Sequence, residues 1–278
     1  MPVVDGFCAF ILTHGRPDNV KTYQTLRQKG YTGRIVLVVD DGDKSLPRYL
    51  DTYGTESVYV FSKSQIALEF DQYDTSSDMR TIVYARNVCF KAAVDLGFSS
   101  FIQLDDDYYW FGHRRVNGAV TTRNLDAIFS SLVRFLQDAP RVTSVAFSQG
   151  GDHIGGYDPE KVMPRKAMNS FVCLTDRPFK FSGRINEDVN TYVGLGATGH
   201  VFLTVPQIQL DQKDTQSNAG GMTDVYLDGG TYIKSFYTVL SNPSCVKVKT
   251  VGIHHPRLHH GISWDNAVPK ILSESYRK

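Results

Sequence analysis

Short apolar runs alternate with amphipathic segments through the first half of the chain. β-Branched and aromatic residues dominate the apolar runs, which is typical of buried strands. Strands are expected at Val3–Leu12, Arg34–Asp40, Ser57–Ser62, Phe101–Leu104 and Val142–Phe147. Helices are expected between Pro17 and Gly30, over Arg80–Leu96 and over Leu125–Leu136. Strands that alternate with helices predict an α/β fold with a mostly parallel, doubly wound sheet.

The second half of the chain has a less regular pattern. It carries four glycine pairs, which are typical of turns, and a polar stretch over Asp211–Gly221 that is expected to form a loop or lid. A further strand is expected over Val246–Ile253. We therefore expect the second half to be mixed in character.

Polar side chains gather where the predicted strands end. Thr13, His14 and Arg16 follow the first strand, while Asp40, Asp41 and Asp43 end the second. Asp105, Asp106 and Asp107 follow the fourth. In open α/β sheets the ligand binds beyond the carboxyl ends of the strands. One edge of the sheet is therefore predicted to be rich in carboxylates and to form the active site.

The triple aspartate is a candidate metal site. Mg²⁺ and Mn²⁺ prefer oxygen ligands and often share them with substrate phosphates. In an extended segment Asp105 and Asp107 face the same way, while Asp106 faces elsewhere, toward a sugar hydroxyl or a backbone amide. A solvated acidic turn is the alternative interpretation.

Composition limits the function classes. The chain of 278 residues is 41% hydrophobic and 21% charged, with a formal net charge of +1, which is ordinary for a globular protein. A partner made of nucleic acid must therefore be met by a local basic patch. The four cysteines are widely spaced, and no signal peptide or membrane span is evident. We expect a cytoplasmic protein that is a monomer or a weak oligomer.

Three stretches together resemble the GT-A glycosyltransferases, especially the family-2-like group. They are FILTHGRPDNV (residues 10–20), VVDDGD (38–43) and YARNVCFKAAVDLGFSSFIQLDDDYYW (84–110). Their order and spacing match the family's first strand, second strand and D-x-D core. The resemblance implies a single GT-A domain over residues 1–278. Residues 1–123 would bind the nucleotide-sugar and residues 124–278 the acceptor.

The same resemblance implies roles for individual residues. Thr13, His14 and Arg16 would lie against the nucleotide, with His14 in place of the family's stacking aromatic residue. Asp40 or Asp41 would bind the uracil ring, and Arg86 would approach the diphosphate or hold the acidic loop. Asp105 and Asp107 would hold Mn²⁺ or Mg²⁺ against the diphosphate of a UDP-sugar.

Two later stretches resemble further parts of the family's site. GRINEDVNTYVGLG (183–196) resembles the Glu-Asp element, and we favour Asp188 over Glu187 as the general base. Both acids could instead stabilise a helix N-terminus. VGIHHPRLHHGISWD (251–265) resembles the segment that supplies a third metal ligand. We favour His255 for that ligand, with His254, His259 and His260 as alternatives.

The acceptor is the least constrained part of the prediction. The chain looks similar to the compact glycosyltransferases that phages encode beside TET-like oxygenases, which implies sugar transfer to 5-hydroxymethylated pyrimidines in double-stranded DNA. Two basic stretches are candidates for DNA contact. The first comprises His113, Arg114, Arg115 and Arg123, and the second Lys161, Arg165, Lys166 and Arg177.

Other functions are compatible with parts of the pattern. A glycan or protein could be the acceptor. A nucleotidyltransferase of related fold is disfavoured because Thr13–Asn19 holds one glycine and no Gly-rich basic run. A non-catalytic binding module is disfavoured by the intact aspartate and Glu-Asp elements.

Overall fold

The computed structural model describes residues 4–115, 117–153, 166–212, 225, 233–252 and 256–268. The strands are β1 (Phe7–Leu12), β2 (Arg34–Asp40), β3 (Val58–Phe61), β4 (Ser100–Asp105), β5 (Tyr108–Arg115), β6 (Gly118–Thr121), β7 (Val142–Gln149), β8 (Ser170–Leu174), β9 (Val201–Gln212), β10 (Val246–Val251) and β11 (Arg257–Ile262). The helices are α1 (Lys21–Gln28), α2 (Leu46–Tyr53), α3 (Lys63–Ile66), α4 (Val83–Asp95), α5 (Leu125–Asp138), α6 (Glu187–Gly196) and α8 (Ile233–Ser241), with short 3₁₀ turns at Thr55–Ser57, Ala67–Glu69 and Gly150–His153.

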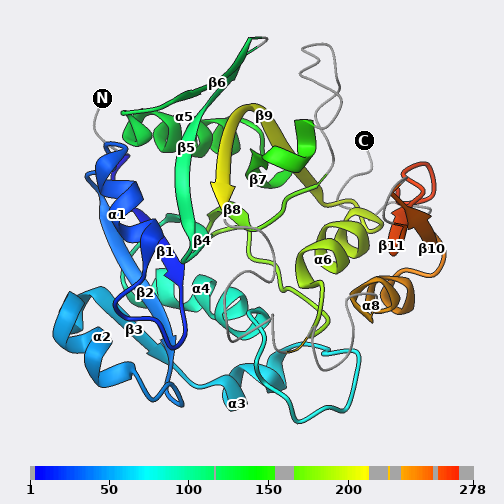
Figure 1. The fold of residues 1–278 in the computed structure, drawn as a ribbon, viewed down its shortest axis with the longest axis horizontal. Helices are drawn as coiled ribbons and strands as arrows, with labels where there is room; N and C mark the ends of the chain where they lie inside the picture. The colour runs from blue at the N-terminus through cyan, green and yellow to red at the C-terminus, as the bar shows by residue number, and fades with distance from the viewer. Residues whose placement is uncertain are drawn as a thin grey trace.

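A nine-stranded sheet forms the centre of the molecule, in the order β3-β2-β1-β4-β8-β7-β9-β5-β6 (Figure 1). Strands β3, β2, β1 and β4 are parallel, as the alternating pattern predicted. Strand β8 pairs antiparallel with β4 and with β7. Strand β5 pairs antiparallel with β9 and with β6, whereas β7 and β9 are parallel. The prediction of an α/β fold with a mixed second half is confirmed.

The two faces of the sheet bury different side chains of the same strand. In β1, Phe7, Ala9 and Ile11 join a core with residues of α1 and α5. Cys8, Phe10 and Leu12 join a second core with residues of α4 and α6. This alternation follows from the two-residue period of a strand, and helices on both faces explain why β1 is apolar throughout.

The two halves of the chain share the sheet. Strands β5 and β6 come from the first 123 residues, yet they lie at the far edge beside β9 from the second half. The predicted division at residue 123 therefore does not separate two sheets. That the first part binds the nucleotide-sugar and the second the acceptor stays a prediction.

Within the described ranges, no helix combines the length and apolar character that crossing a bilayer requires.

Two segments differ from the sequence-based expectation. Tyr108–Arg115 forms strand β5, which was not predicted, because it pairs with β9 on one side and β6 on the other. Helix α2 was not predicted, although Pro47 lies in its first turn, where a missing N–H is harmless. Of the loop expected over Asp211–Gly221, Asp211 and Gln212 belong to β9 and residues 213–221 lie outside the described residues.

Candidate active site

The acidic turn after β4 is fixed in place by α1. Leu12 pairs with Asp105, so the ends of β1 and β4 lie side by side. The Thr22 hydroxyl donates to the Asp105 carbonyl oxygen at 2.6 Å and accepts from the Tyr108 amide at 2.9 Å. The Thr22 amide donates to the Asp106 carbonyl oxygen at 3.1 Å. A single buried threonine thus bridges the two ends of the turn.

Asp106 is engaged by the loop after β1. Its Oδ2 accepts from the Thr13 hydroxyl at 2.7 Å, and its Oδ1 pairs with Arg16 Nη1 at 3.1 Å. The Tyr49 hydroxyl lies 2.8 Å from Thr13 Oγ1 and accepts from the Arg16 amide. Asp106 therefore binds side chains of this protein through both of its carboxylate oxygens. Its direct contact with the donor stays a prediction.

Arg86 links the acidic turn to the Glu-Asp element. Its guanidinium is 1% exposed and pairs with Asp105 Oδ1 at 3.1 Å and with Glu187 Oε1 at 2.8 Å. Two carboxylates raise the pKa of Arg86 against the opposing effect of its burial, so it stays charged. Of the two predicted roles, these contacts match holding the acidic loop.

Asp188 stands beside this ion-pair network. Helix α6 begins at Glu187, directly after Asn186, whose left-handed conformation (φ 61°) makes a sharp entry to the helix. Asp188 is buried, and burial together with the neighbouring Glu187 charge raises its pKa to about 7. A carboxyl group with a pKa near neutrality is suited to proton transfer.

Burial and mutual repulsion also affect the triple aspartate. Burial raises the pKa of Asp105 to about 7; Arg86 opposes this rise and the Asp107 charge adds to it. Burial and the charge of Asp106 raise the pKa of Asp107. Burial thus disfavours the charged forms of Asp105 and Asp107, and a cation bound at the turn would stabilise those charged forms.

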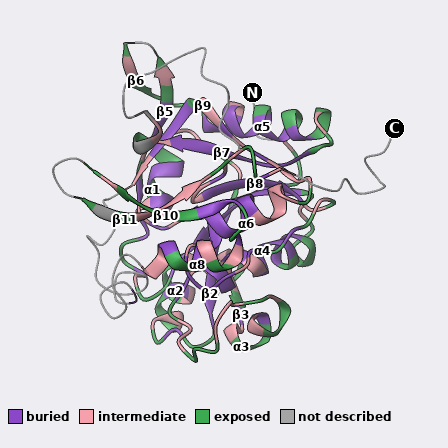
Figure 2. Cartoon of the chain, turned by 90° about the vertical axis from the view of Figure 1, so that its right-hand side faces the viewer, coloured by how far each residue is buried: buried purple, intermediate pink, exposed green. Residues whose placement is uncertain are grey.

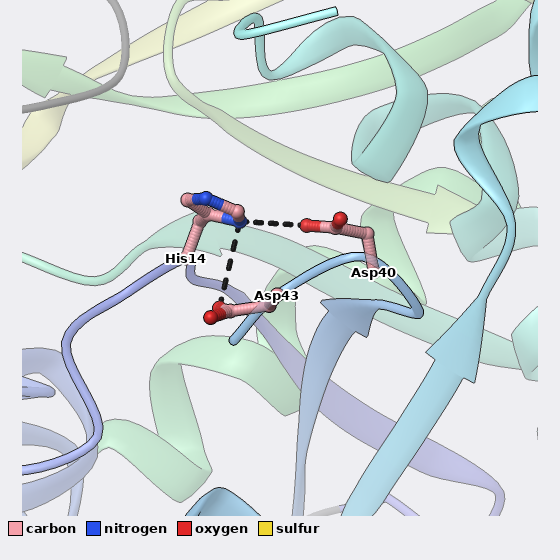
Figure 3. Close-up of side chains that lie close together, drawn as sticks. All are labelled: His14, Asp40 and Asp43. Carbon is pink, nitrogen blue, oxygen red and sulfur yellow. Dashed lines mark hydrogen bonds and ion pairs between the residues drawn. The ribbon is translucent and has the colours of Figure 1, made fainter. Parts of the chain in front are cut away.

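A second acidic group lies at the ends of β1 and β2 (Figure 3). His14 Nδ1 lies 2.7 Å from Asp40 Oδ2 and 3.5 Å from Asp43 Oδ2. Lys63 Nζ lies 3.1 Å from the same Asp40 oxygen. Although burial alone would raise the pKa of Asp40, His14 and Lys63 hold it below its usual value. Asp41 is exposed and lies outside this group, and the choice between Asp40 and Asp41 for the uracil ring stays a prediction.

The late histidine segment reaches the start of α6. His260 Nδ1 lies 3.5 Å from Asn186 Nδ2, and burial lowers the pKa of His260 to about 3. A neutral imidazole therefore lies close to the Glu-Asp element. The favoured ligand His255 and its neighbour His254 lie outside the described residues, so that assignment stays a prediction.

Comparison with known proteins identifies the family. A family model described as TET-associated glycosyltransferase matches residues 7–221, well over half of the chain. The chain belongs to the TET-associated glycosyltransferase family. The expected glycosyltransferase class is thereby confirmed at the level of the family. A search of curated proteins finds no match.

One solved structure supports the fold of this TET-associated glycosyltransferase, and two more are similar at lower TM-scores. The mannosyltransferase PcManGT from Pyrobaculum calidifontis, solved with GDP-Man and Mn²⁺, is 13% identical with a TM-score of 0.52. The match covers 85% of this chain and 63% of that enzyme. Glucosyl-3-phosphoglycerate synthase from Mycobacterium tuberculosis is 10% identical with a TM-score of 0.45, covering 92% of this chain and 87% of that one. S. aureus TarS 1–349 is 12% identical with a TM-score of 0.47, covering 84% and 66%. The expected GT-A fold is confirmed.

The donor set of this TET-associated glycosyltransferase fits a hard divalent cation. Asp105 and Asp107 offer carboxylate oxygens at one turn, the ligand type that Mg²⁺ and Mn²⁺ prefer. Among the described residues, one trio of potential ligands lies within 4.8 Å, and it is His14, Asp40 and Asp43. Asp40 already pairs with Lys63, and Asp43 accepts from the amides of Gly15 and Ser45. The carboxylates of the trio are therefore already engaged by cationic and amide donors of this protein.

Three residues of the site were missed by sequence analysis. Thr22 and Tyr49 come from the helices that follow β1 and β2, and their hydroxyls hold the predicted loops in place. Lys63 lies two residues after the last residue of β3, so a search of the segments that follow strands would have found it. Thr22 and Tyr49 carry no comparable signal, because a buried hydroxyl in a helix is usually structural.

The aromatic residues after the acidic turn have separate surroundings. Tyr108 is buried, and its hydroxyl donates to the Asn169 carbonyl oxygen at 2.6 Å. A Cβ added at Gly112 would meet the Trp110 ring at 2.3 Å, so Trp110 lies against the backbone of β5. Tyr109 is 54% exposed. Tyr108 is therefore a structural residue, while Tyr109 is the most exposed of the three aromatic side chains.

Proposed function

We propose that this protein transfers a sugar from a UDP-sugar to the hydroxyl of a 5-hydroxymethylated pyrimidine in double-stranded DNA, with Mn²⁺ or Mg²⁺. One observation carries the proposal: Arg86 joins Asp105 of the acidic turn to Glu187, the neighbour of Asp188. A candidate metal ligand and a candidate base are thus connected through one buried side chain. A metal ion at the diphosphate and a base at the acceptor hydroxyl are the two catalytic functions that glycosyl transfer can use.

Residues at the ends of β1 and β2 would bind the nucleotide. His14 is half exposed and is held by Asp40, so its outer ring edge is available to a uracil. Lys63 and the amide of Gly15 fix the two carboxylates behind it. Arg16 is partly exposed beside Asp106 and would lie near the phosphates. The ring of His14 would replace a stacking aromatic residue.

Asp105, Asp107 and a histidine of the late segment would hold the metal ion. When bound, the ion neutralises the negative charge that develops on the departing diphosphate. Arg86 keeps the Asp105 carboxylate in a fixed position, and Thr22 fixes the backbone of the same turn. A pre-organised turn of this kind needs little rearrangement during the reaction.

Asp188 would act as the general base. It would accept the proton of the acceptor hydroxyl while that oxygen bonds to the anomeric carbon of the sugar. The bond from this carbon to the diphosphate oxygen breaks, and UDP leaves. Attack opposite the leaving group would invert the anomeric carbon, which agrees by analogy with the family-2-like group.

DNA is supported as the acceptor by the family and by local charge. The matching family is named for its association with TET, and the resemblance noted from sequence is to enzymes that act beside TET-like oxygenases. A 5-hydroxymethyl group projects into the major groove, so it can be reached without flipping the base.

The four cysteines are buried and free, which supports a reducing, cytoplasmic setting. For a protein encoded by a phage, this setting would be the cytoplasm of the host.

The test is incubation with a panel of UDP-sugars and hydroxymethylcytosine duplex DNA, followed by mass spectrometry of the nucleosides. We expect one sugar to produce a hydroxymethylcytosine heavier by one glycosyl unit, only with Mn²⁺ or Mg²⁺ present. Sugar appearing on a glycan or protein acceptor, with the DNA unmodified under every donor, would replace DNA as the acceptor. Release of pyrophosphate in place of UDP would indicate a nucleotidyltransferase.

A further inference from the structure

The hairpin of β5 and β6 carries a concentrated positive charge. The sixteen residues from Tyr108 to Arg123 contain three arginines and a histidine and no acidic residue. The whole chain, by contrast, has 29 acidic and 30 basic residues. An even distribution would therefore have placed acids in this stretch as well. The charge balance of the molecule is locally broken at the hairpin.

These cations have no acidic partners in the described part of the chain. His113, Arg114, Arg115 and Arg123 form no ion pair with any described residue, and Arg114 Nε is buried without a hydrogen-bond partner. Other arginines do have carboxylate partners: Arg16 pairs with Asp106, Arg86 with Asp105 and Glu187. The hairpin therefore carries charge that no described carboxylate neutralises.

The second basic stretch differs from the hairpin. Lys166 pairs with Asp152, and Arg177 donates to the carbonyl oxygens at the end of α5, including Leu136 and Ala139. These two residues have structural roles, while Lys161 and Arg165 lie outside the described residues. The hairpin is the better supported of the two candidate surfaces.

The shape of the hairpin suits a groove with charged walls. Strand β9 pairs with β5 only as far as His113, so Arg114 and Arg115 belong to a ribbon of two strands. This ribbon projects past α5 at the top of Figure 1, and β6 is largely exposed in Figure 2. Successive residues of a strand face opposite sides, so Arg114 and Arg115 place charge on both faces. The major groove admits a two-stranded ribbon and has phosphates along both walls.

The hairpin is directly continuous with the acidic turn. Strand β5 begins one residue after Asp107, and a strand rises about 3.3 Å per residue, which puts Arg114 about 23 Å along the chain from that aspartate. This length is enough for the two-stranded part to lie in a groove while a base near the start of β5 faces the turn. The exposed Tyr109 lies at this start of β5.

We propose that the β5–β6 hairpin is the DNA-binding element and that it enters the major groove of the acceptor duplex. This inference rests on the proposed function and deepens it. The groove that receives the ribbon is the groove into which a 5-hydroxymethyl group projects. The ribbon would therefore guide the modified base to Asp107 and Asp188 while the base remains stacked.

The test is the salt dependence of binding to hydroxymethylated duplex DNA, measured for four proteins. They are the unaltered chain, the double variant Arg114→Ala/Arg115→Ala, the charge-preserving Arg114→Lys/Arg115→Lys, and Arg134→Ala/Arg141→Ala. The last removes the same charge from exposed positions on and after α5. Each phosphate contact contributes about 0.9 to the slope of log K against log salt, so the first double variant should lower the slope by about 2. The lysine variant and the α5 control should keep the original slope.

The outcomes separate this inference from the proposed function. UDP affinity and melting temperature of each variant report whether the donor side is intact. The hairpin assignment is wrong if the two double alanine variants lower the slope equally, or if neither lowers it. The proposed function stands in that case, provided that the DNA still receives sugar. If the unaltered chain binds duplex DNA with no salt dependence, both the hairpin assignment and the DNA acceptor are wrong. Preference for single-stranded over duplex DNA would also overturn the major-groove assignment.

Discussion

Glu187 and Asp188 are neighbours in sequence but have different surroundings. Glu187 Oε1 accepts from Arg86 at 2.8 Å, which commits it to an ion pair. Burial and the Glu187 charge raise the pKa of Asp188 to about 7. When two adjacent carboxyl groups differ in this way, one is suited to charge stabilisation and the other to proton transfer. The ion pair of Glu187 and the burial of Asp188 are the reasons for proposing Asp188 as the base.

Replacing Asp188 with Asn should reduce transfer by about 10²–10⁴-fold, the usual contribution of a positioned general base. UDP affinity should be retained, because Asp188 is separate from the residues proposed to bind nucleotide. Steady-state kinetics and calorimetry measure the two quantities. If Glu187→Gln is inactive and Asp188→Asn active, with both folded, the assignment within the pair is reversed.

The pH dependence of transfer should report the same group. A general base works in its deprotonated form, so kcat/KM should rise with pH and level off above about 7, where the Asp188 carboxyl has lost its proton. The Asp188→Asn variant should lack this rise in its residual activity. A rise of the same midpoint in both proteins would mean that another group titrates.

The pairing of Arg86 with Glu187 shows what sequence could not provide. These residues are 101 positions apart, and no local pattern relates them. The aspartates at the strand ends were predictable, because a parallel sheet brings its carboxyl ends to one edge. The side-chain contacts between those ends depend on the packing of α4 and α6, which only the folded chain shows.

At the scale of elements, α1 holds the acidic turn through Thr22. Replacing Thr22 with Val keeps the shape but leaves the Asp105 carbonyl oxygen and the Tyr108 amide without this partner. A buried polar group without its partner costs about 1–3 kcal/mol, so unfolding in urea should show a loss of this size. Transfer should fall as well, because the turn loses its fixed position.

Thr25→Val is the matched control for this change. Thr25 is buried on the same helix, and its hydroxyl makes no hydrogen bond with the described residues. Its replacement should leave the free energy of unfolding nearly unchanged. Equal losses in the two variants would show that any hydroxyl on this face of α1 matters, and that the turn is held by other contacts.

The elements themselves were predicted unevenly. The parallel strands were visible from their apolar runs, since both faces are buried. Strand β5 was not, because its acid-free, arginine-rich end pairs only with β6 and has no apolar alternation. The order of β8, β7 and β9 depends on contacts between distant segments, which periodicity does not encode.

At the scale of the whole molecule, near-neutral net charge conceals an acidic edge and a basic hairpin. Asp107→Ala should abolish turnover while the protein stays folded, because burial and the Asp106 charge already disfavour the charged form of Asp107. Circular dichroism and initial rates with Mn²⁺ measure both properties. Asp51→Ala, an exposed acid on α2, is the control and should keep full activity. Near-normal transfer by Asp107→Ala in EDTA would exclude the metal role.

The central claim is metal-dependent transfer from a UDP-sugar to hydroxymethylated DNA. Its most direct test is UDP release from the preferred donor, measured with and without Mn²⁺ and with hydroxymethylated or unmodified duplex. The account predicts that rapid UDP release requires both the ion and the hydroxymethylated duplex, with slow hydrolysis when the duplex is unmodified. UDP release at the same rate with either duplex, or at the same rate after the metal is removed, would contradict it.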